Sequence, residues 1–140
     1  MANLNRKVAV PAEEIDRQRE FMLLVHDISE ARFLSQGNYP KAFVRTYGCQ
    51  GNVADGEKLK GMLEEMGYQL VDSPEGADFV LYNTCAIREH AEDRVFGNVG
   101  ALKNNKRRNP SMLIGLCGCM MQQENVDKKI KKSYPYVDLV

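Results

Sequence analysis

The hydrophobic pattern of residues 41–140 consists of short apolar runs separated by segments with a helical period. The apolar runs predict strands over residues 41–47, 68–71, 79–82, 112–116 and 136–140. Helices are predicted between them, one capped by Asp55, one over residues 87–103 and one over residues 122–132. The core-facing positions of these helices are Leu59, Met62, Leu63, Met66, Ala91, Val95, Val99, Leu102, Val126 and Ile130. This order predicts an α/β fold, a doubly wound (flavodoxin/Rossmann-like) parallel sheet with an added N-terminal helix.

Residues 1–40 are predicted to be a mostly helical N-terminal extension, and residues 41–140 the α/β domain. Pro11 and the acidic residues after it start a helix over residues 12–35, and the Gly37-Asn38-Tyr39-Pro40 segment ends it. We predict that this helix packs on the domain, with binding to a partner as the alternative. Its apolar residues are Ile15, Phe21, Met22, Leu24, Val25, Ile28 and Phe33. Because the chain closes on a predicted strand, we expect it to be a fragment of a longer protein.

The charge balance argues against a general attraction to nucleic acid. The chain has 140 residues, of which 19 are basic and 19 acidic, and its pI is about 6.7. Any affinity for RNA must then be local or come from elsewhere. No apolar run approaches the roughly 18 residues of a membrane span, and no signal-peptide pattern is present. The chain has only four cysteines and none in the first 40 residues, so we expect reduced thiols in a cytoplasmic protein. We also expect the protein to be monomeric and not bound to a membrane.

The cysteines lie at the predicted strand-to-helix turns. Three similar segments carry them: Tyr47-Gly48-Cys49, Asn83-Thr84-Cys85 and Cys117-Gly118-Cys119. In an open parallel sheet such turns share one edge, where ligands usually bind. We therefore expect three thiols that lie 36 and 34 residues apart in the sequence (85 minus 49 and 119 minus 85) to meet at one site.

Two kinds of metal centre compete for these thiols. Structural zinc usually takes four ligands in close pairs, whereas Cys117 and Cys119 are the only close pair here. An iron–sulfur cluster suits thiols from separate turns, and three ligands would leave one iron open for a substrate. Aligning the two Gly-Cys turns places Cys119 opposite Cys49, and Cys117 opposite Tyr47, a strand-end residue. This alignment favours Cys119 as a ligand and Cys117 as a packing residue.

Longer motifs surround the three turns. They are Thr46-Tyr47-Gly48-Cys49-Gln50-x-Asn52, Ala77-Asp78, Asn83-Thr84-Cys85-Ala86-Ile87-Arg88-Glu89 and Gly118-Cys119-Met120. Together they resemble the amino-terminal domain of the radical-SAM methylthiotransferases, over about residues 41–140. The Cys-Ala-Ile-Arg-Glu segment is most similar to the tRNA-modifying type, which adds a methylthio group to C2 of N6-isopentenyladenosine. Gly51 and Gly56 depart from the family, where methionine and serine are usual.

The resemblance implies a cofactor and a substrate. Cys49, Cys85 and Cys119 would hold an auxiliary 4Fe-4S cluster whose open iron accepts a sulfur species, and tRNA would be the substrate of the full-length enzyme. In that family a barrel with a second 4Fe-4S cluster and S-adenosylmethionine follows, and then a small RNA-binding domain. Neither is present in this sequence, so this fragment alone is not expected to be catalytic. The alternative is a non-catalytic flavodoxin-like module with a zinc or redox cysteine site.

Polar residues near the three turns are weaker candidates for functional residues than the cysteines. Those that could orient a ligand or substrate are Asn52, Asp55, Asn83, Thr84 and Arg88. Asp55 and Thr84 are equally well explained as helix caps, whereas Arg88 would place a cation beside an anionic cluster. His90 is expected to be a surface helix residue. The basic residues within 103–108 are expected in a solvated loop opposite the cysteines, and those within 128–132 at a helix C-terminus.

Overall fold

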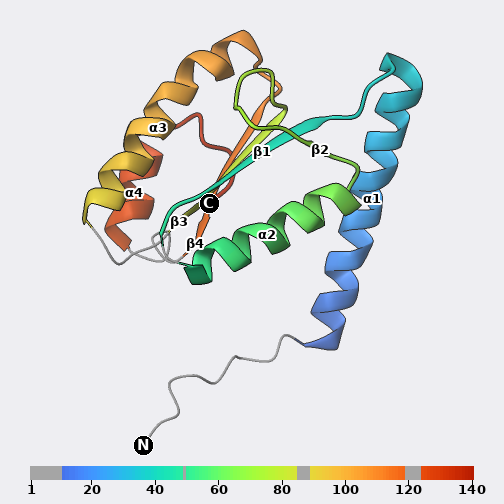
Figure 1. The fold of residues 1–140 in the computed structure, drawn as a ribbon, viewed down its shortest axis with the longest axis horizontal. Coiled ribbons are helices and arrows are strands. Elements are labelled where there is room, and N and C mark those ends of the chain that lie inside the picture. The colour runs from blue at the N-terminus through green and yellow to red at the C-terminus, as the bar shows by residue number, and fades with distance from the viewer. Residues whose placement is uncertain (1–10, 49, 85–88, 119–123) are drawn as a thin grey trace, which may run out of the picture.

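The computed structural model describes residues 11–48, 50–84, 89–118 and 124–140, and strands and helices alternate after a long first helix (Figure 1). The helices are α1 (Ala12–Gln36), α2 (Gln50–Glu65), α3 (Glu89–Arg108) and α4 (Glu124–Ser133). The strands are β1 (Lys41–Thr46), β2 (Gln69–Leu70), β3 (Phe79–Thr84) and β4 (Leu113–Gly118). None of the helices described is long and apolar enough to cross a membrane.

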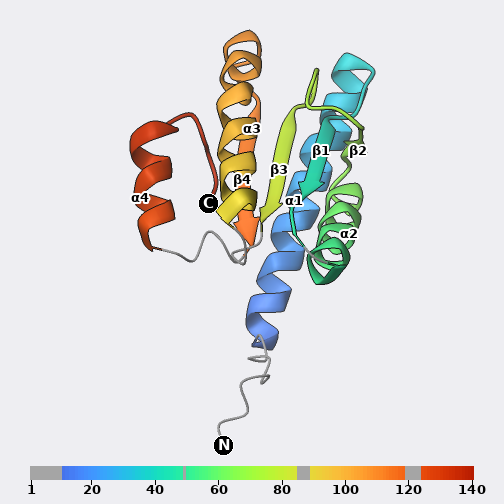
Figure 2. The ribbon, with the colours of Figure 1, turned by 60° about the vertical axis from the view of Figure 1, so that its left-hand side comes forward.

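The four strands form one parallel sheet in the order β2-β1-β3-β4. The chain moves from β1 to one side and from β3 to the other, so its direction across the sheet reverses between these two strands. Right-handed crossovers therefore place α2 on one face and α3 on the other, and α4 lies on the side of α3 (Figures 1 and 2). The predicted doubly wound α/β fold with an added N-terminal helix is confirmed.

Successive strand residues face opposite helical layers, which gives the domain two apolar clusters. The larger lies between the sheet, α3 and α4 and contains Phe43, Tyr47, Ala77, Val80, Tyr82, Val95, Phe96, Val99, Leu102, Met112, Ile114, Leu116, Val126 and Ile130. The smaller lies under α2 and contains Ala42, Val44 and Leu63. Burial confirms the predicted inward positions of α4 and of the described part of α3, but Met62 of α2 is exposed. The side chain of Ala91 lies outside the described residues.

The start of α2 differs from the prediction. The helix begins at Gln50, directly after Cys49, so Asp55 lies inside it and does not cap it. Two glycines weaken the helical signal of this segment, which is why the pattern placed the start too late. Gly56 is buried against Thr46 of β1, and a Cβ there would collide with the Thr46 hydroxyl oxygen. Packing on β1 thus outweighs the low helix propensity.

The end of α3 also differs from the prediction. Residues 103–108 continue the helix rather than forming a loop, and Lys106 within them makes two contacts outside the helix. Its ammonium group contacts the carbonyl oxygen of Met112 and lies 2.8 Å from the carboxylate of Asp138. Three basic residues in the last turn also suit the negative end of the helix dipole. The predicted start of this helix at residue 87 lies outside the described residues.

Several strand bounds differ as well, and β1 and β2 are shorter than predicted. β3 and β4 each run two residues beyond the predicted ends, to Thr84 and Gly118. The predicted strand at residues 136–140 is only a single parallel bridge between Leu139 and Gly115. The predicted start of the last helix at residue 122 lies outside the described residues.

Helix α1 meets the domain at the C-terminal end of α2. It ends at Gly37, which adopts a left-handed conformation with φ of 79°. The Ser29 hydroxyl donates a 2.8 Å hydrogen bond to the Met66 carbonyl, and Ser29 contacts Gly67. On the N-terminal side of Ser29, the side chains of Phe21 and Ile28 are exposed to solvent. The prediction that the apolar side of this helix packs on the domain is therefore wrong for these side chains in the part of the chain that is described.

Candidate functional site

The three turns with cysteines follow three adjacent strands. Thr46 at the end of β1 pairs with Asn83, and Thr84 at the end of β3 pairs with Gly118 at the end of β4. Neighbouring strands lie about 4.8 Å apart, so the turns after β1, β3 and β4 start side by side at the carboxyl edge of the sheet. The edge includes the reversal point between β1 and β3, the usual ligand-binding crevice of this fold.

The predicted ligands themselves lie just past these strand ends. Cys49 comes three residues after Thr46, and Cys85 and Cys119 directly follow Thr84 and Gly118. All three fall outside the described residues, as does Arg88, and the side chains of Asn52 and His90 are likewise outside the description. Among the described residues, no group of three or more histidine, cysteine or acidic side chains is placed to hold a metal ion. The ligand assignment stays a prediction, and three thiols on adjacent turns are a donor set that fits it.

A row of small polar side chains crosses the sheet below this edge. Thr46, Asn83 and Cys117 are register partners on three neighbouring strands, and by alternation they share the face covered by α2. Asn83 is buried, and Cys117 and Thr46 are half-buried. The non-local register creates this row, so sequence spacing alone could not reveal it.

Cys117 is built into this row as a neutral thiol. Its Sγ lies 3.8 Å from Oδ1 of Asn83, to which the thiol donates. Burial raises the pKa of Cys117, and the carboxylate of Asp55 raises it further. Both effects disfavour the thiolate that metal binding requires, which agrees with a packing role. Its place near the end of β4 matches the predicted strand-end position.

The edge between β3 and β4 is unusually close-packed. Gly118 has φ of 100°, and a Cβ on it would lie 2.7 Å from the backbone nitrogen of Thr84. Thr84 is fully buried, and its hydroxyl donates a 2.7 Å hydrogen bond to the Cys117 carbonyl. This hydrogen bond fixes the two strand ends relative to each other, a role that the helix-cap interpretation of Thr84 missed. Cys85 and Cys119 are the next residues along the chain.

On the opposite face, Tyr47 ties the edge to α3. Its hydroxyl accepts a 2.6 Å hydrogen bond from Nδ2 of Asn98, and its ring meets that of Tyr82 edge to face at 5.6 Å. Burial, followed by the neighbouring Tyr47, raises the pKa of Tyr82 to about 12, while Arg45 opposes the shift. The raised pKa of Tyr82 favours its neutral phenol form. The sequence singled out Tyr47 only as a motif residue, and nothing in the pattern pointed to Asn98.

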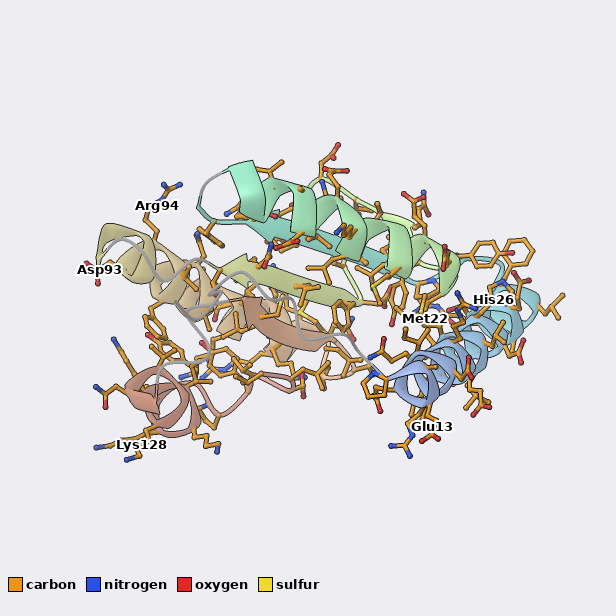
Figure 3. All side chains as sticks on the ribbon, turned by 90° about the horizontal axis from the view of Figure 1, so that it is seen from below. Glu13, Met22, His26, Asp93, Arg94 and Lys128 are labelled. Atoms are coloured by element: carbon orange, nitrogen blue, oxygen red, sulfur yellow. The ribbon has the colours of Figure 1, made fainter. Side chains whose placement is uncertain are left out.

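The basic segment at the end of α3 lies away from this edge. Arg108, at the end of α3, pairs with Glu75 at 3.5 Å in the loop at the opposite edge of the sheet. Lys129 of α4 stacks over the ring of Phe96 at 4.2 Å. In Figure 3, Asp93 and Arg94 of α3 and Lys128 of α4 point outward from the domain. The position of residues 103–108 opposite the cysteines agrees with the prediction, although they are helical.

Comparison with known proteins identifies the family. Residues 41–140 match the model of the uncharacterized protein family UPF0004. The chain belongs to this family. It is 46% identical over 135 residues to the tRNA-2-methylthio-N(6)-dimethylallyladenosine synthase of Clostridioides difficile. This alignment covers 96% of this chain and 28% of that protein. The enzyme of the same name from Geobacillus kaustophilus is 49% identical over 125 residues, which are 89% of this chain and 24% of that protein.

These relatives confirm the resemblance to tRNA methylthiotransferases. They are enzymes, and the UPF0004 chain spans only about a quarter of their length. The family match begins at the first residue of β1. An alignment of 135 residues leaves at most five of this chain unmatched (140 minus 135), so it also includes most of α1. The sequence of the N-terminal helix is therefore largely included in the match to at least one relative.

Proposed function

We propose that the chain is the auxiliary iron–sulfur domain of a tRNA methylthiotransferase that adds a methylthio group to C2 of N6-isopentenyladenosine. Cys49, Cys85 and Cys119 would hold a 4Fe-4S cluster with three thiolates. The observation that carries the proposal is the register of β1, β3 and β4, whose adjacent ends lead directly into the three turns. The names of the relatives support the substrate class.

The chain's own residues would prepare this site in two ways. α2 begins at Gln50, so Cys49 directly precedes a helix N-terminus, where the thiolate form is favoured. The Thr84–Cys117 hydrogen bond and the close approach at Gly118 hold the ends of β3 and β4 in a fixed relation. Thiolates that start from a rigid edge keep a constant spacing and need little rearrangement to bind.

When bound, the cluster would supply an iron without a protein ligand, to which a sulfur species can attach. Cys117 is the only other cysteine, and its thiol lies within β4 and donates to Asn83. We infer that Cys117 leaves that iron open. In the full-length protein, a second 4Fe-4S cluster and S-adenosylmethionine would act in a separate barrel, a small RNA-binding domain would follow it, and tRNA would be the substrate of the whole enzyme. We further propose a cytoplasmic, monomeric protein.

Metal analysis after anaerobic reconstitution tests the proposal. Four iron atoms and four acid-labile sulfides per chain, with loss of both after substitution of the predicted ligands, are expected. One zinc per chain with no sulfide would refute the cluster and favour a flavodoxin-like module with a zinc site. A chain that binds neither metal but forms a reversible disulfide would favour the redox version of that module.

A further inference from the structure

Helix α1 carries an apolar stripe on the side turned away from the domain. Phe21, Leu24 and Ile28 follow the i, i+3, i+7 spacing of one helical face, and they are 59%, 57% and 68% exposed. Ser29, which lies about 100° around the helix from Ile28, is only 2% exposed and bonds to the end of α2. A helix with large apolar residues on both sides is normally covered on both sides.

The N-terminal half of α1 makes little contact with the domain. Residues 11–21 are all exposed, and a hollow of about 240 Å³ lined by Arg19, Met22, Leu23 and Glu65 separates this half from α2. The helix extends past the sheet and α2 in both ribbon views (Figures 1 and 2). In Figure 3, Met22 lies on the side of α1 that faces the domain and Glu13 on the side turned away. The domain thus leaves the outer stripe without cover among the described residues.

Charge narrows the class of partner. Residues 12–36 contain six acidic residues and three arginines, a net charge of −3 (3 minus 6) with histidine neutral. A negative helix is repelled by RNA phosphates and by anionic lipid surfaces. Two copies of α1 laid against each other would bring like charges together, which disfavours self-association through the stripe. The stripe therefore fits an apolar protein surface with a basic rim.

The relatives show that a longer polypeptide is available to cover the stripe. The alignment with the Clostridioides difficile enzyme takes in most of α1, while 72% of that enzyme's length (100 minus 28) lies outside the match. We propose that the outer stripe of α1, Phe21, Leu24 and Ile28, docks intramolecularly on the part of the methylthiotransferase polypeptide beyond this domain. Helix α1 would then fix the orientation of the UPF0004 domain relative to the remainder of the enzyme. This inference rests on family membership and not on the cluster.

Hydrogen–deuterium exchange of the α1 amides tests the docking. The 140-residue chain and the full-length polypeptide that contains it are compared at the same low concentration. In the full-length protein, exchange over residues 12–28 should slow by about tenfold or more relative to the isolated chain.

Ile28→Glu in the full-length protein should restore fast exchange, because it places a charge in the docked face. Leu34→Glu is the matched control, since Leu34 is 83% exposed on the same helix but outside the stripe, and it should leave the protection unchanged. Exchange of α3 and the far-ultraviolet circular dichroism report that each variant is folded.

Three results would overturn the proposal. Equal exchange of α1 in the two proteins would mean that the remainder does not cover the helix. Protection of the isolated chain that rises with its concentration, together with a dimer in sedimentation, would identify a second copy as the partner. Protection that appears only when tRNA is added would assign the stripe to RNA binding. None of these readouts depends on metal content, so failure of the cluster assignment and failure of the docking are distinguishable.

Discussion

The amide nitrogen of Asn98 lies 2.6 Å from the hydroxyl of Tyr47 and donates a hydrogen bond to it across the space between α3 and the end of β1. The Tyr47 side chain is buried, and that of Asn98 is half-buried. The bond therefore connects the turn before Cys49 with the helix that follows Cys85. It holds these two elements of the site relative to each other.

We expect Tyr47→Phe to lower the free energy of unfolding by about 1 kcal/mol, because it leaves the Asn98 amide without its acceptor. Urea denaturation of Tyr47→Phe, Asn98→Ala and the double variant measures the coupling between the two side chains. Asn104→Ala, an exposed amide on the same helix, is the control and should change stability by less than about 0.5 kcal/mol. Additive losses in the double variant would contradict the bond.

Gly118→Ala should destabilise the domain by at least about 2 kcal/mol. Its φ of 100° is unfavourable for alanine, and the new Cβ would be forced against the backbone of Thr84. Gly61→Ala is the matched control, because a Cβ on that helical residue meets no atom within 4 Å and should stabilise α2 by up to about 1 kcal/mol. Equal effects of the two substitutions in urea denaturation would show that the β3–β4 edge tolerates a side chain.

Cys49→Ala, Cys85→Ala and Cys119→Ala are each expected to abolish stable cluster binding, whereas Cys117→Ala should retain it. Cys85 and Cys119 directly follow strand ends and Cys49 comes three residues after one, while the Cys117 thiol donates to Asn83 within the sheet. Iron and sulfide content after reconstitution, with the visible charge-transfer absorbance, measures the difference. A loss in Cys117→Ala as large as in the other three would make Cys117 a ligand.

The domain should stay folded without its cluster. The apolar cluster between the sheet, α3 and α4 is formed by side chains that do not depend on a metal, and a 140-residue chain is large enough for such a core. A triple variant with Cys49, Cys85 and Cys119 changed to alanine should keep helical circular dichroism and melt cooperatively. A disordered triple variant would assign the metal a structural role.

Alkylation of Cys117 should require a higher pH than alkylation of an unperturbed thiol. Burial and the Asp55 carboxylate raise its pKa in the folded state, so the protein favours the protonated thiol. The resulting stabilisation is complete below the ordinary thiol pKa and is lost as the pH rises through the raised value. Iodoacetamide labelling followed by peptide mass spectrometry gives the pH profile. Asp55→Asn should shift the pH profile of Cys117 labelling to lower pH. Asp93→Asn removes an exposed carboxylate on α3 and is the control, which should leave the profile unchanged. Identical profiles for Asp55→Asn and the unmodified protein would exclude Asp55 as a cause of the raised pKa.

Local sequence was sufficient where one segment determines its own structure. The apolar run before Asn83-Thr84-Cys85 specifies a buried strand, and the spacing of Val95, Val99 and Leu102 specifies the inner face of α3. These patterns placed the three turns with cysteines at one edge of a parallel sheet. The order of β1, β3 and β4 then confirmed that these strands are neighbours.

The local sequence did not predict features that depend on contacts between residues distant in the chain. The start of α2 depends on Gly56 packing against Thr46, and the length of α3 on the pairing of Lys106 with Asp138. The thiol environment of Cys117 depends on the register between β3 and β4. Such contacts leave no periodic signal, so only the folded chain reveals them.

The parallel pairing of β1, β3 and β4 has a consequence for the order of events during folding. Thr46 and its partner Asn83 are 37 residues apart (83 minus 46), and Thr84 and Gly118 are 34 apart (118 minus 84). Every strand contact at the edge is therefore long-range, and closing such loops is slow compared with forming a helix. No partly folded segment can bring all three turns together before β4 docks on β3. A nascent chain that emerges from the ribosome thus acquires the edge formed by β1, β3 and β4 only after residue 118 has been synthesised, and a cofactor bound as proposed could be inserted only from that moment.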